Sequence, residues 1–119
     1  MSTIKKIGND ISVEVSVYVY KDNNYPNGVM YIAYCPELDL TGYDTTERGA
    51  RKSFEFVMSD YLNDTIAKGT LEADLISHGW KKKNGRMIEP TYQSMYRNGK
   101  FSEIIKKREF KKYSVPVGV

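Results

Sequence analysis

The segment ISVEVSVYVY, residues 11–20, decides the fold because its apolar residues occupy every second position. Side chains of a β-strand point alternately to opposite faces, so this spacing predicts a strand with one buried face. Every residue of the apolar set is β-branched, which favours a strand over a helix. The buried face is predicted to consist of Ile11, Val13, Val15, Val17 and Val19.

The residues that follow predict two more antiparallel strands. KDNNYPNG (21–28) has the Asn, Pro and Gly content of a hairpin loop. Residues 29–35 form an apolar strand that ends before Pro36, because proline cannot donate to the ladder. After a short loop, residues 40–43 are predicted to form a third strand.

A long helix is predicted next, since apolar residues recur at helical spacing as far as Lys68. It is expected to begin at Asp44 or Thr45. Asp44 can accept backbone N–H groups as the N-cap, with Glu47 as its partner in a capping box. Gly69 is the expected C-cap, because glycine tolerates the left-handed conformation that ends many helices.

The centre of the chain predicts a second helix and a small hairpin. Residues 70–77 have the pattern of a short helix, and residues 80–83 that of a strand anchored by its tryptophan. Asn84-Gly85 is a turn sequence, after which 86–88 pair back. Further on, a helix is predicted over 101–109 and a strand over 109–117.

These elements predict an α+β fold, with a small, mostly antiparallel sheet in the order β-β-β-α-α-β and the helices on one face. We expect an α+β domain over residues 1–88. Residues 89–119 are expected to be a basic C-terminal extension.

Length and composition restrict the class of protein. The chain of 119 residues and 13.7 kDa is long enough for one domain with its own core. No apolar run approaches the roughly 18 residues that a membrane span needs, and the N-terminus has no signal-peptide core. We therefore expect a cytoplasmic protein. One cysteine and one histidine exclude a disulfide framework and a histidine-rich or multi-cysteine metal site, and no cofactor is expected.

The net charge of +3 conceals an asymmetry. Residues 1–78 carry 7 basic and 12 acidic side chains, a balance of −5, whereas 79–119 carry 11 and 3, a balance of +8. Basic residues near aromatic ones in the C-terminal part favour a nucleic-acid contact, with a solvated face or a self-association strand as alternatives. The candidate nucleic-acid-binding residues are Lys106, Lys107, Arg108, Lys111 and Lys112.

A few side chains could carry chemistry. Glu14, Asp39 and Asp44 are candidate ligands for Mg²⁺ in a ribonuclease-H-like nuclease, provided that they converge. The alternative is that they are surface, loop and cap residues. His78 follows a predicted helix end, where it can satisfy the helix C-terminus. Cys35 ends an apolar strand and is predicted to be a buried structural thiol.

The segment YIAYCPELDL (31–40) predicts a protein-binding face. A strand with tyrosines runs into a proline turn with two carboxylates, which suits a basic protein partner. Ordinary sheet and turn is the alternative. The candidate partner-binding residues are Tyr34, Glu37, Leu38 and Asp39.

The middle of the chain resembles the HicB family of antitoxins over about residues 11–83. The order and spacing of several short motifs carry the resemblance. They are Tyr31-Ile32-Ala33, Pro36-Glu37-Leu38, Gly42, Asp44-Thr45, Tyr61-Leu62 and Gly79-Trp80.

This resemblance implies a partial ribonuclease-H-like fold that lacks the catalytic carboxylates, and hence a binding protein and not an enzyme. It implies that the chain binds and masks a small basic mRNA-cleaving toxin of the HicA type, that the complex represses its own operon through operator DNA, and that the chain forms a homo-oligomer. The sequence departs from the family at Arg48-Gly49, where Glu-Ala is usual. It also lacks the pattern of a helix-turn-helix or ribbon-helix-helix domain.

Overall fold

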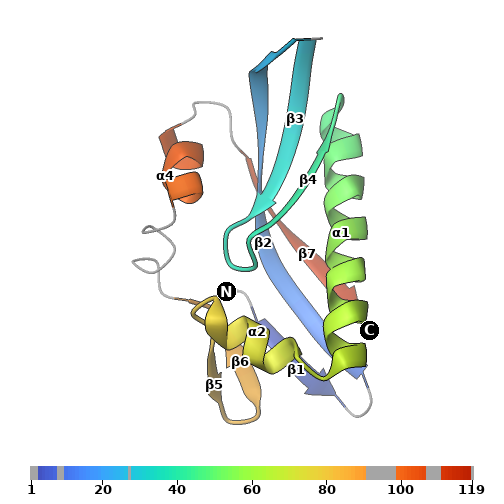
Figure 1. Cartoon of the computed structure of the whole chain (residues 1–119), viewed down its shortest axis with the longest axis vertical. Helices are drawn as coiled ribbons and strands as arrows, with labels where there is room; N and C mark the ends of the chain where they lie inside the picture. Colours follow the sequence, from blue (N-terminus) through green and yellow to red (C-terminus); the bar gives the residue numbers. More distant parts are fainter. Residues whose placement is uncertain (1–2, 8–9, 27, 91–98, 107–110, 119) are drawn as a thin grey trace.

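The computed structural model describes residues 3–7, 10–26, 28–90, 99–106 and 111–118. In these residues the protein is a small α+β fold built on one antiparallel sheet (Figure 1). The strands are β1 (Thr3–Ile7), β2 (Asp10–Tyr25), β3 (Gly28–Cys35), β4 (Leu40–Asp44), β5 (Lys81–Lys83), β6 (Arg86–Ile88) and β7 (Lys111–Gly118). The helices are α1 (Glu47–Lys68), α2 (Leu71–Ser77) and α4 (Gly99–Lys106).

Strand β2 is the axis of the sheet and contains the predicted strand 11–20. The backbones of Ser12, Val13 and Glu14 pair with both β1 and β7. Those of Tyr18 and Val19 pair with both β3 and β7. Strand β7 therefore lies along one edge of β2, and β1 and β3 share the other edge. The sheet continues beyond β3 to β4, and beyond β1 to β6 and β5.

The main core lies between the sheet and α1. The valines of β2 at positions 13, 15, 17 and 19 are all buried, which confirms the predicted face, while the side chain of Ile11 lies outside the described part. They pack with a row of α1 residues that recurs once per helical turn. That row consists of Ala50, Phe54, Met58 and Leu62.

Gly42 sets the distance between α1 and the sheet. A Cβ atom at this position would overlap the backbone of Phe54, so only glycine lets the helix lie this close to β4. Ser53, on the same turn of α1, accepts a hydrogen bond from the backbone N–H of Tyr43 at 3.2 Å. Helix α1 thus rests directly on the edge strand of the sheet.

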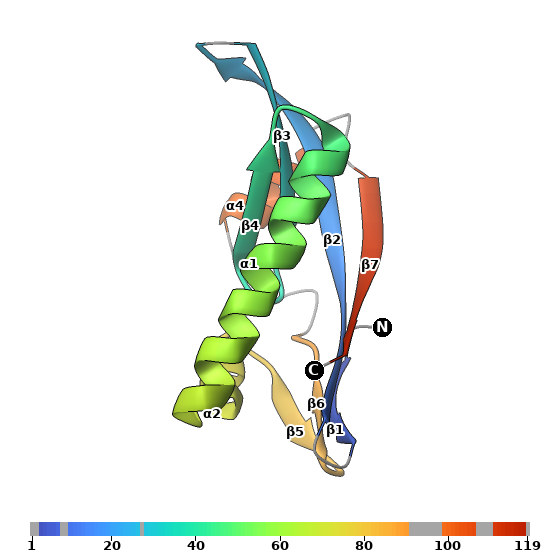
Figure 2. The same cartoon turned by 90° about the vertical axis from the view of Figure 1, so that its right-hand side faces the viewer.

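Helix α4 covers the opposite face of the sheet, as Figures 1 and 2 show. Phe101 and Ile104 are buried against Tyr20, Ile32 and Tyr34 in a second, smaller core. The predicted placement of the helices on one face holds for α1 and α2, which share the main core, whereas α4 in the predicted extension lies on the other face. The tyrosines of β2 belong to the parity that looked polar, but a tyrosine ring has enough apolar surface to form a core of its own.

The predicted order β-β-β-α-α-β is incomplete. Within the described residues the order is β-β-β-β-α-α-β-β-α-β. Strand β1 is a five-residue strand with two lysines, too short and polar to stand out in the sequence. The predicted extension, residues 89–119, contributes to the same sheet as residues 1–88. Strand β7 pairs with β2, and α4 packs on the face of the sheet opposite to α1.

The ends of α1 follow local rules with one correction. Thr46 is the N-cap and accepts the backbone N–H of Gly49 at 3.0 Å. Asp44, the predicted N-cap, is instead the last residue of β4, and Glu47 pairs with Arg51 at 3.3 Å instead of closing a capping box. Gly69 ends the helix with a φ of 67°, as predicted. None of the helices in the described part is long and apolar enough to cross a membrane.

We expect Gly42→Ala to destabilise the protein by about 1–3 kcal/mol, because α1 must move away from β4 to make room for the methyl group. Chemical denaturation followed by circular dichroism measures the change. Gly99→Ala is the matched control, since a Cβ at that helix start meets nothing within 4 Å. Equal stability of the Gly42→Ala variant and the wild type would contradict the close approach.

Candidate functional site

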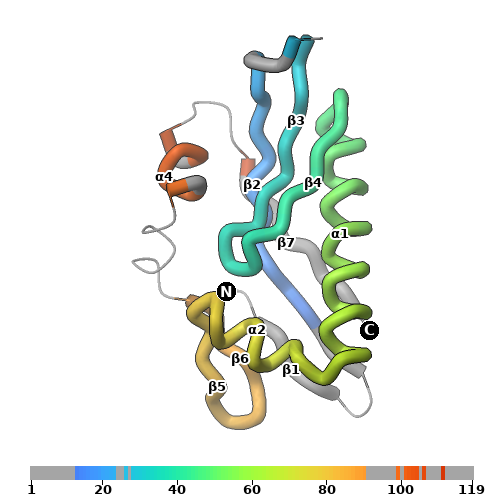
Figure 3. Tube along the Cα trace, in the orientation of Figure 1, coloured from blue at the N-terminus to red at the C-terminus, as the bar shows by residue number. Residues whose placement is uncertain are grey.

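The loop between β3 and β4 lies inside the protein, although loops usually run over the surface. Figure 3 shows this tight loop folded back beside the centre of the sheet. Leu38 is 1% exposed and belongs to the main core, and the Glu37 side chain is only 3% exposed. Two of the predicted partner-binding residues are therefore packed within the chain itself.

Trp80, which is distant in the sequence, forms a hydrogen bond with this loop. Its indole Nε1–H donates a hydrogen bond of 2.7 Å to the backbone carbonyl of Glu37, and the ring is 2% exposed. A buried carbonyl needs such a donor, because leaving it unsatisfied costs about 1–3 kcal/mol. The tryptophan predicted to anchor the strand at 80–83 thus also joins the start of β5 to the β3–β4 loop.

Tyr34 and Asp39 form a second hydrogen bond that holds the same loop. The Tyr34 hydroxyl donates to Asp39 Oδ1 at 2.9 Å, and the tyrosine ring is fully buried in the core under α4. Asp39 has a φ of 52°, a left-handed conformation that aspartate tolerates better than most residues. Of the four predicted partner-binding residues only Asp39 is exposed, and the others would need α4 or the core to open.

The face under α4 continues to an exposed tyrosine that the sequence interpretation did not select. Tyr20, Ile32 and Tyr43 stand opposite one another across β2, β3 and β4, and opposed residues share a face. Tyr20 and Ile32 are buried by α4, whereas Tyr43 on the edge strand is 63% exposed. The alternation of side chains along β4 could have predicted the exposure of Tyr43. Gly42 faces α1, so the next residue, Tyr43, faces the other side of the sheet.

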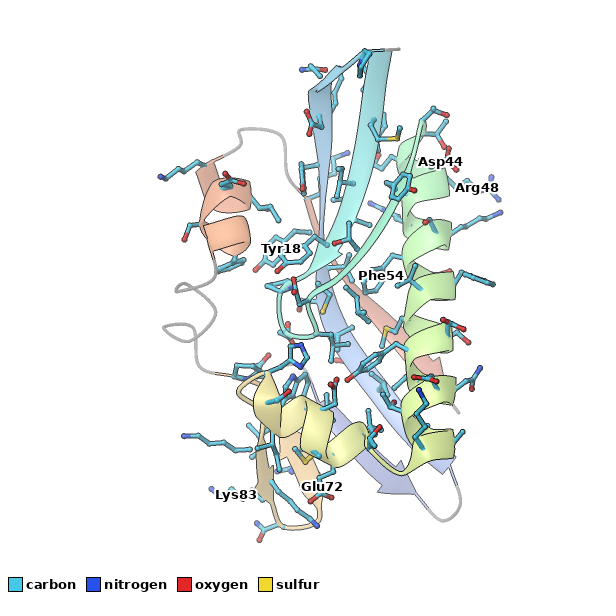
Figure 4. The ribbon with its side chains drawn as sticks, in the orientation of Figure 1. Tyr18, Asp44, Arg48, Phe54, Glu72 and Lys83 are labelled. Carbon is cyan, nitrogen blue, oxygen red and sulfur yellow. The ribbon has the colours of Figure 1, made fainter. Side chains whose placement is uncertain are left out.

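Exposed carboxylates lie at both ends of β4. Asp39 precedes the strand and Asp44 ends it, as Figure 4 shows for Asp44 beside the start of α1. The Asp44 Oδ1 atom accepts the backbone N–H of Thr45 at 2.6 Å, which fixes its position. We call Asp39, Tyr43 and Asp44 the β4 edge: an exposed aromatic ring on an edge strand that Asp39 precedes and Asp44 ends, with the Asp44 carboxylate turned towards Gly49 of α1.

The predicted ligands of a nuclease metal do not come together. Asp39 and Asp44 are separated by the length of β4, about 16 Å of extended chain. Glu14 lies on β2, opposite Thr3 and Pro116. Within the described residues, no three His, Cys, Asp or Glu side chains are grouped so as to hold a metal ion.

The predicted basic tail is distributed over two elements. Lys106 is an exposed residue at the end of α4, and Lys111 begins β7 and lies 3.5 Å from Glu47 on α1. Lys112 pairs through its backbone with Tyr18. Lys107 and Arg108 lie outside the described residues. Of the five predicted nucleic-acid-binding residues, the two with described side chains thus lie on different elements, one of them paired with a carboxylate.

His78 is the C-cap of α2, as predicted. Its Nδ1 atom lies 2.8 Å from the backbone carbonyl of Asp74 and 3.6 Å from the carboxylate of the same residue. The Tyr61 hydroxyl donates to that carboxylate, and burial together with this hydrogen bond raises the pKa of Tyr61. The Tyr61–Asp74 contact joins α1 to α2, and His78 satisfies the C-terminus of α2.

Cys35 is fully buried at the end of β3, as predicted. Burial raises the pKa of the Cys35 thiol far above its usual range, and the neighbouring charge of Glu37 raises it further. The thiol is therefore protonated at physiological pH and belongs to the core.

The comparisons with known proteins return no relative. The chain matches no protein-family model, and neither the curated proteins nor the solved structures contain a significant match. Its function is therefore inferred from its own residues and their geometry.

Trp80→Phe should lower the free energy of unfolding by about 1–3 kcal/mol, because it removes the donor to the buried Glu37 carbonyl while keeping an aromatic ring. Since Trp80 is the only tryptophan, unfolding is followed by circular dichroism and not by fluorescence. Tyr61→Phe, which removes a half-buried hydrogen bond, should cost less. An equal loss in both variants would show that the Trp80 bond has no special weight.

The Cys35 thiol should react with a disulfide reagent at least about 100-fold more slowly in the native protein than in denaturant, because burial suppresses the thiolate. Above about pH 8.5 the unfolded chain ionises this thiol while the folded chain does not. The free energy of unfolding should therefore fall as the pH rises through this range, and a Cys35→Ala variant should lose that dependence. Rapid labelling of the native protein would contradict the burial.

Proposed function

We propose that the chain is a protein-binding module that neutralises a small, basic, mRNA-cleaving toxin of the HicA type by occluding it. The observation that carries the proposal is the β4 edge, where Tyr43 is 63% exposed on a strand that Asp39 precedes and Asp44 ends. Tyrosine is enriched at protein interfaces, and flanking negative charge speeds encounter with a basic partner.

The positions of the HicB-like motifs support a shared strand–loop–strand–helix unit. Ala33 and Leu62 are fully buried, Leu38 is buried in the core, and Gly42 has no room for a side chain. These residues have a packing role, so we assign recognition of the partner to exposed residues of the same unit. The proposal includes a partial ribonuclease-H-like arrangement of this unit.

The partner is expected to meet side chains more than the backbone of β4. An open edge strand can accept another strand, but the backbone N–H of Tyr43 is already donated to Ser53 Oγ. The ring of Tyr43 stands on the face away from α1, beside Ile32, which α4 covers. A partner seated there would contact the edge of the sheet without displacing the helix.

The proposal extends to a cytoplasmic location, to a complex that contacts operator DNA and to a homo-oligomer. Strand β7 lies at an edge of β2, where self-association could take place. It contains Pro116, which lacks an N–H and limits how far a second strand can pair. Size-exclusion chromatography with light scattering measures the oligomeric state.

Tyr43→Ala should weaken binding to a HicA-type toxin at least tenfold, because the ring is the largest exposed apolar side chain on the β4 edge. The toxin encoded by the neighbouring open reading frame is the partner to co-express and titrate. Wild-type binding should weaken as salt is raised, since the flanking carboxylates attract a basic partner.

Phe56→Ala is the matched control for this experiment. Phe56 is 75% exposed on α1, away from β4, and its loss should leave toxin binding unchanged. If both variants bind as the wild type does, the β4 edge is not the interface. If the wild type neither co-purifies with the toxin nor blocks its RNA cleavage at low salt, the antitoxin proposal is wrong.

A further inference from the structure

The β5–β6 hairpin concentrates positive charge at one end of the molecule. Lys81, Lys82, Lys83 and Arg86 are all exposed within six residues. The turn between the strands is tight, since Asn84 and the following glycine have φ values of 51° and 77°. Positive φ values at two consecutive residues are typical of a type I′ turn, whose twist matches that of the flanking strands. The four cations therefore stand on a defined two-stranded ribbon.

The cations divide between the two faces of this ribbon. Lys82 stands opposite Met87, which is buried in the main core, and Lys82 Nζ lies 3.3 Å from Glu72 on α2. Figure 4 shows Glu72 beside the hairpin that carries Lys83. This lysine therefore belongs to the face that packs towards α2, and its charge is compensated.

The other face of the ribbon carries three cations, and the exposed carboxylate on the same face of the sheet, Glu14, lies two strands further on, beyond β6 and β1. Lys83 stands opposite Arg86, and Lys81 lies two residues before Lys83 on the same face. None of the three forms an ion pair within the described part of the chain. Adjacent strands are about 4.8 Å apart and alternate residues about 6.7 Å, so the three charges rise from a patch under 10 Å across.

The ribbon also continues the sheet. Strand β6 pairs with β1, and the backbone of Lys5 lies in register with that of Arg86. Figures 1 and 2 both place the hairpin at the end of the molecule opposite to the β2–β3 turn, with α4 in the other half. The patch thus lies in the other half of the molecule from α4, while Trp80, the residue before Lys81, contacts the loop that carries Asp39.

We propose that Lys81, Lys83 and Arg86 bind the phosphate backbone of duplex DNA, with the β5–β6 hairpin lying along or in a groove. Clustered lysine and arginine side chains bind phosphates by releasing condensed counterions. A two-stranded ribbon fits the major groove of B-form DNA, whereas the major groove of duplex RNA is too narrow. This inference rests on the DNA contact that the proposed function includes and assigns it to the hairpin, but it does not depend on toxin binding.

The absence of a stacking platform on the hairpin favours a duplex over a single strand. Proteins that bind single strands stack bases on exposed aromatic side chains. The aromatic residue at the base of β5 is Trp80, which is buried and donates its N–H to the β3–β4 loop. No residue from Lys81 to Ile88 is aromatic. Contact with phosphates is therefore the interaction that this surface offers.

The test is a titration of labelled, random-sequence duplex DNA with the full chain, followed by fluorescence anisotropy at several salt concentrations. The variant Lys81→Gln/Lys83→Gln/Arg86→Gln should bind at least tenfold more weakly at about 50 mM salt. Its slope of log affinity against log salt should be shallower by about 2–3, because each lost phosphate contact contributes roughly 0.9. Circular dichroism checks that the exposed substitutions leave the fold intact.

The matched control is Arg48→Gln/Lys52→Gln/Lys68→Gln, which removes the same charge from α1. It should keep wild-type affinity and slope, and an equal loss in both triple variants would reduce the effect to net charge and overturn the site. A Lys106→Gln/Lys111→Gln variant that alone loses binding would move the site to the C-terminal elements.

Three further outcomes would overturn the inference. They are no binding of duplex DNA by the wild type at about 50 mM salt, equal or tighter binding of duplex RNA of the same sequence, and equal competition by polyglutamate at matched charge. None of these measurements needs the toxin, so this inference and the antitoxin proposal fail or succeed separately.

Discussion

The alternation of side chains along β2 is the constraint on which the rest of the structure depends. Its valines face α1 and form the main core, while Tyr18 and Tyr20 face α4. Because the two faces of one strand serve two cores, helices are needed on both sides of the sheet. The backbone of β2 also pairs along both edges, so β7 is held by the same strand that holds β3. The tyrosine ring of Tyr18 meets that of Phe101 edge-on at 5.6 Å, which fixes α4 against this face.

The local features were predictable because each has a strong physical cause in a few adjacent residues. The valine parity, the C-cap at Gly69 and the turn at Asn84-Gly85 are of this kind. The misses depended on distant partners. The cover provided by α4 could not be inferred from Tyr18 and Tyr20 alone, since a tyrosine serves equally at a surface and in a core. The N-cap moved from Asp44 to Thr46 because β4 extends one residue further than its sequence indicates.

The candidate site also depends on contacts between residues that are distant in the sequence. Tyr34, Glu37 and Leu38 stood out in the sequence because an acidic proline turn follows a tyrosine strand. The turn is instead pulled inward by the Trp80 bond to Glu37 and by the Tyr34 bond to Asp39. Trp80, 43 positions from Glu37 in the chain, thus holds this loop inside the fold, where it has a structural role. The exposed surface moves one strand along, to Tyr43, whose orientation follows from the demand for glycine at position 42.

The charge asymmetry of the sequence also takes a different form in space. The division at residue 78 suggested an acidic body and a basic tail, but residues 81–88 belong to the body's own sheet through β6 and β1. Since Lys111 faces Glu47 across the fold, part of the C-terminal charge is neutralised internally. Three cations that form no ion pair within the described residues lie on a hairpin near one end of a molecule 45 Å long, and β4 lies at the other end of the strand order. A net charge of +3 is therefore compatible with two surfaces of opposite sign. The proposed contacts with a basic protein and with DNA therefore use different residues.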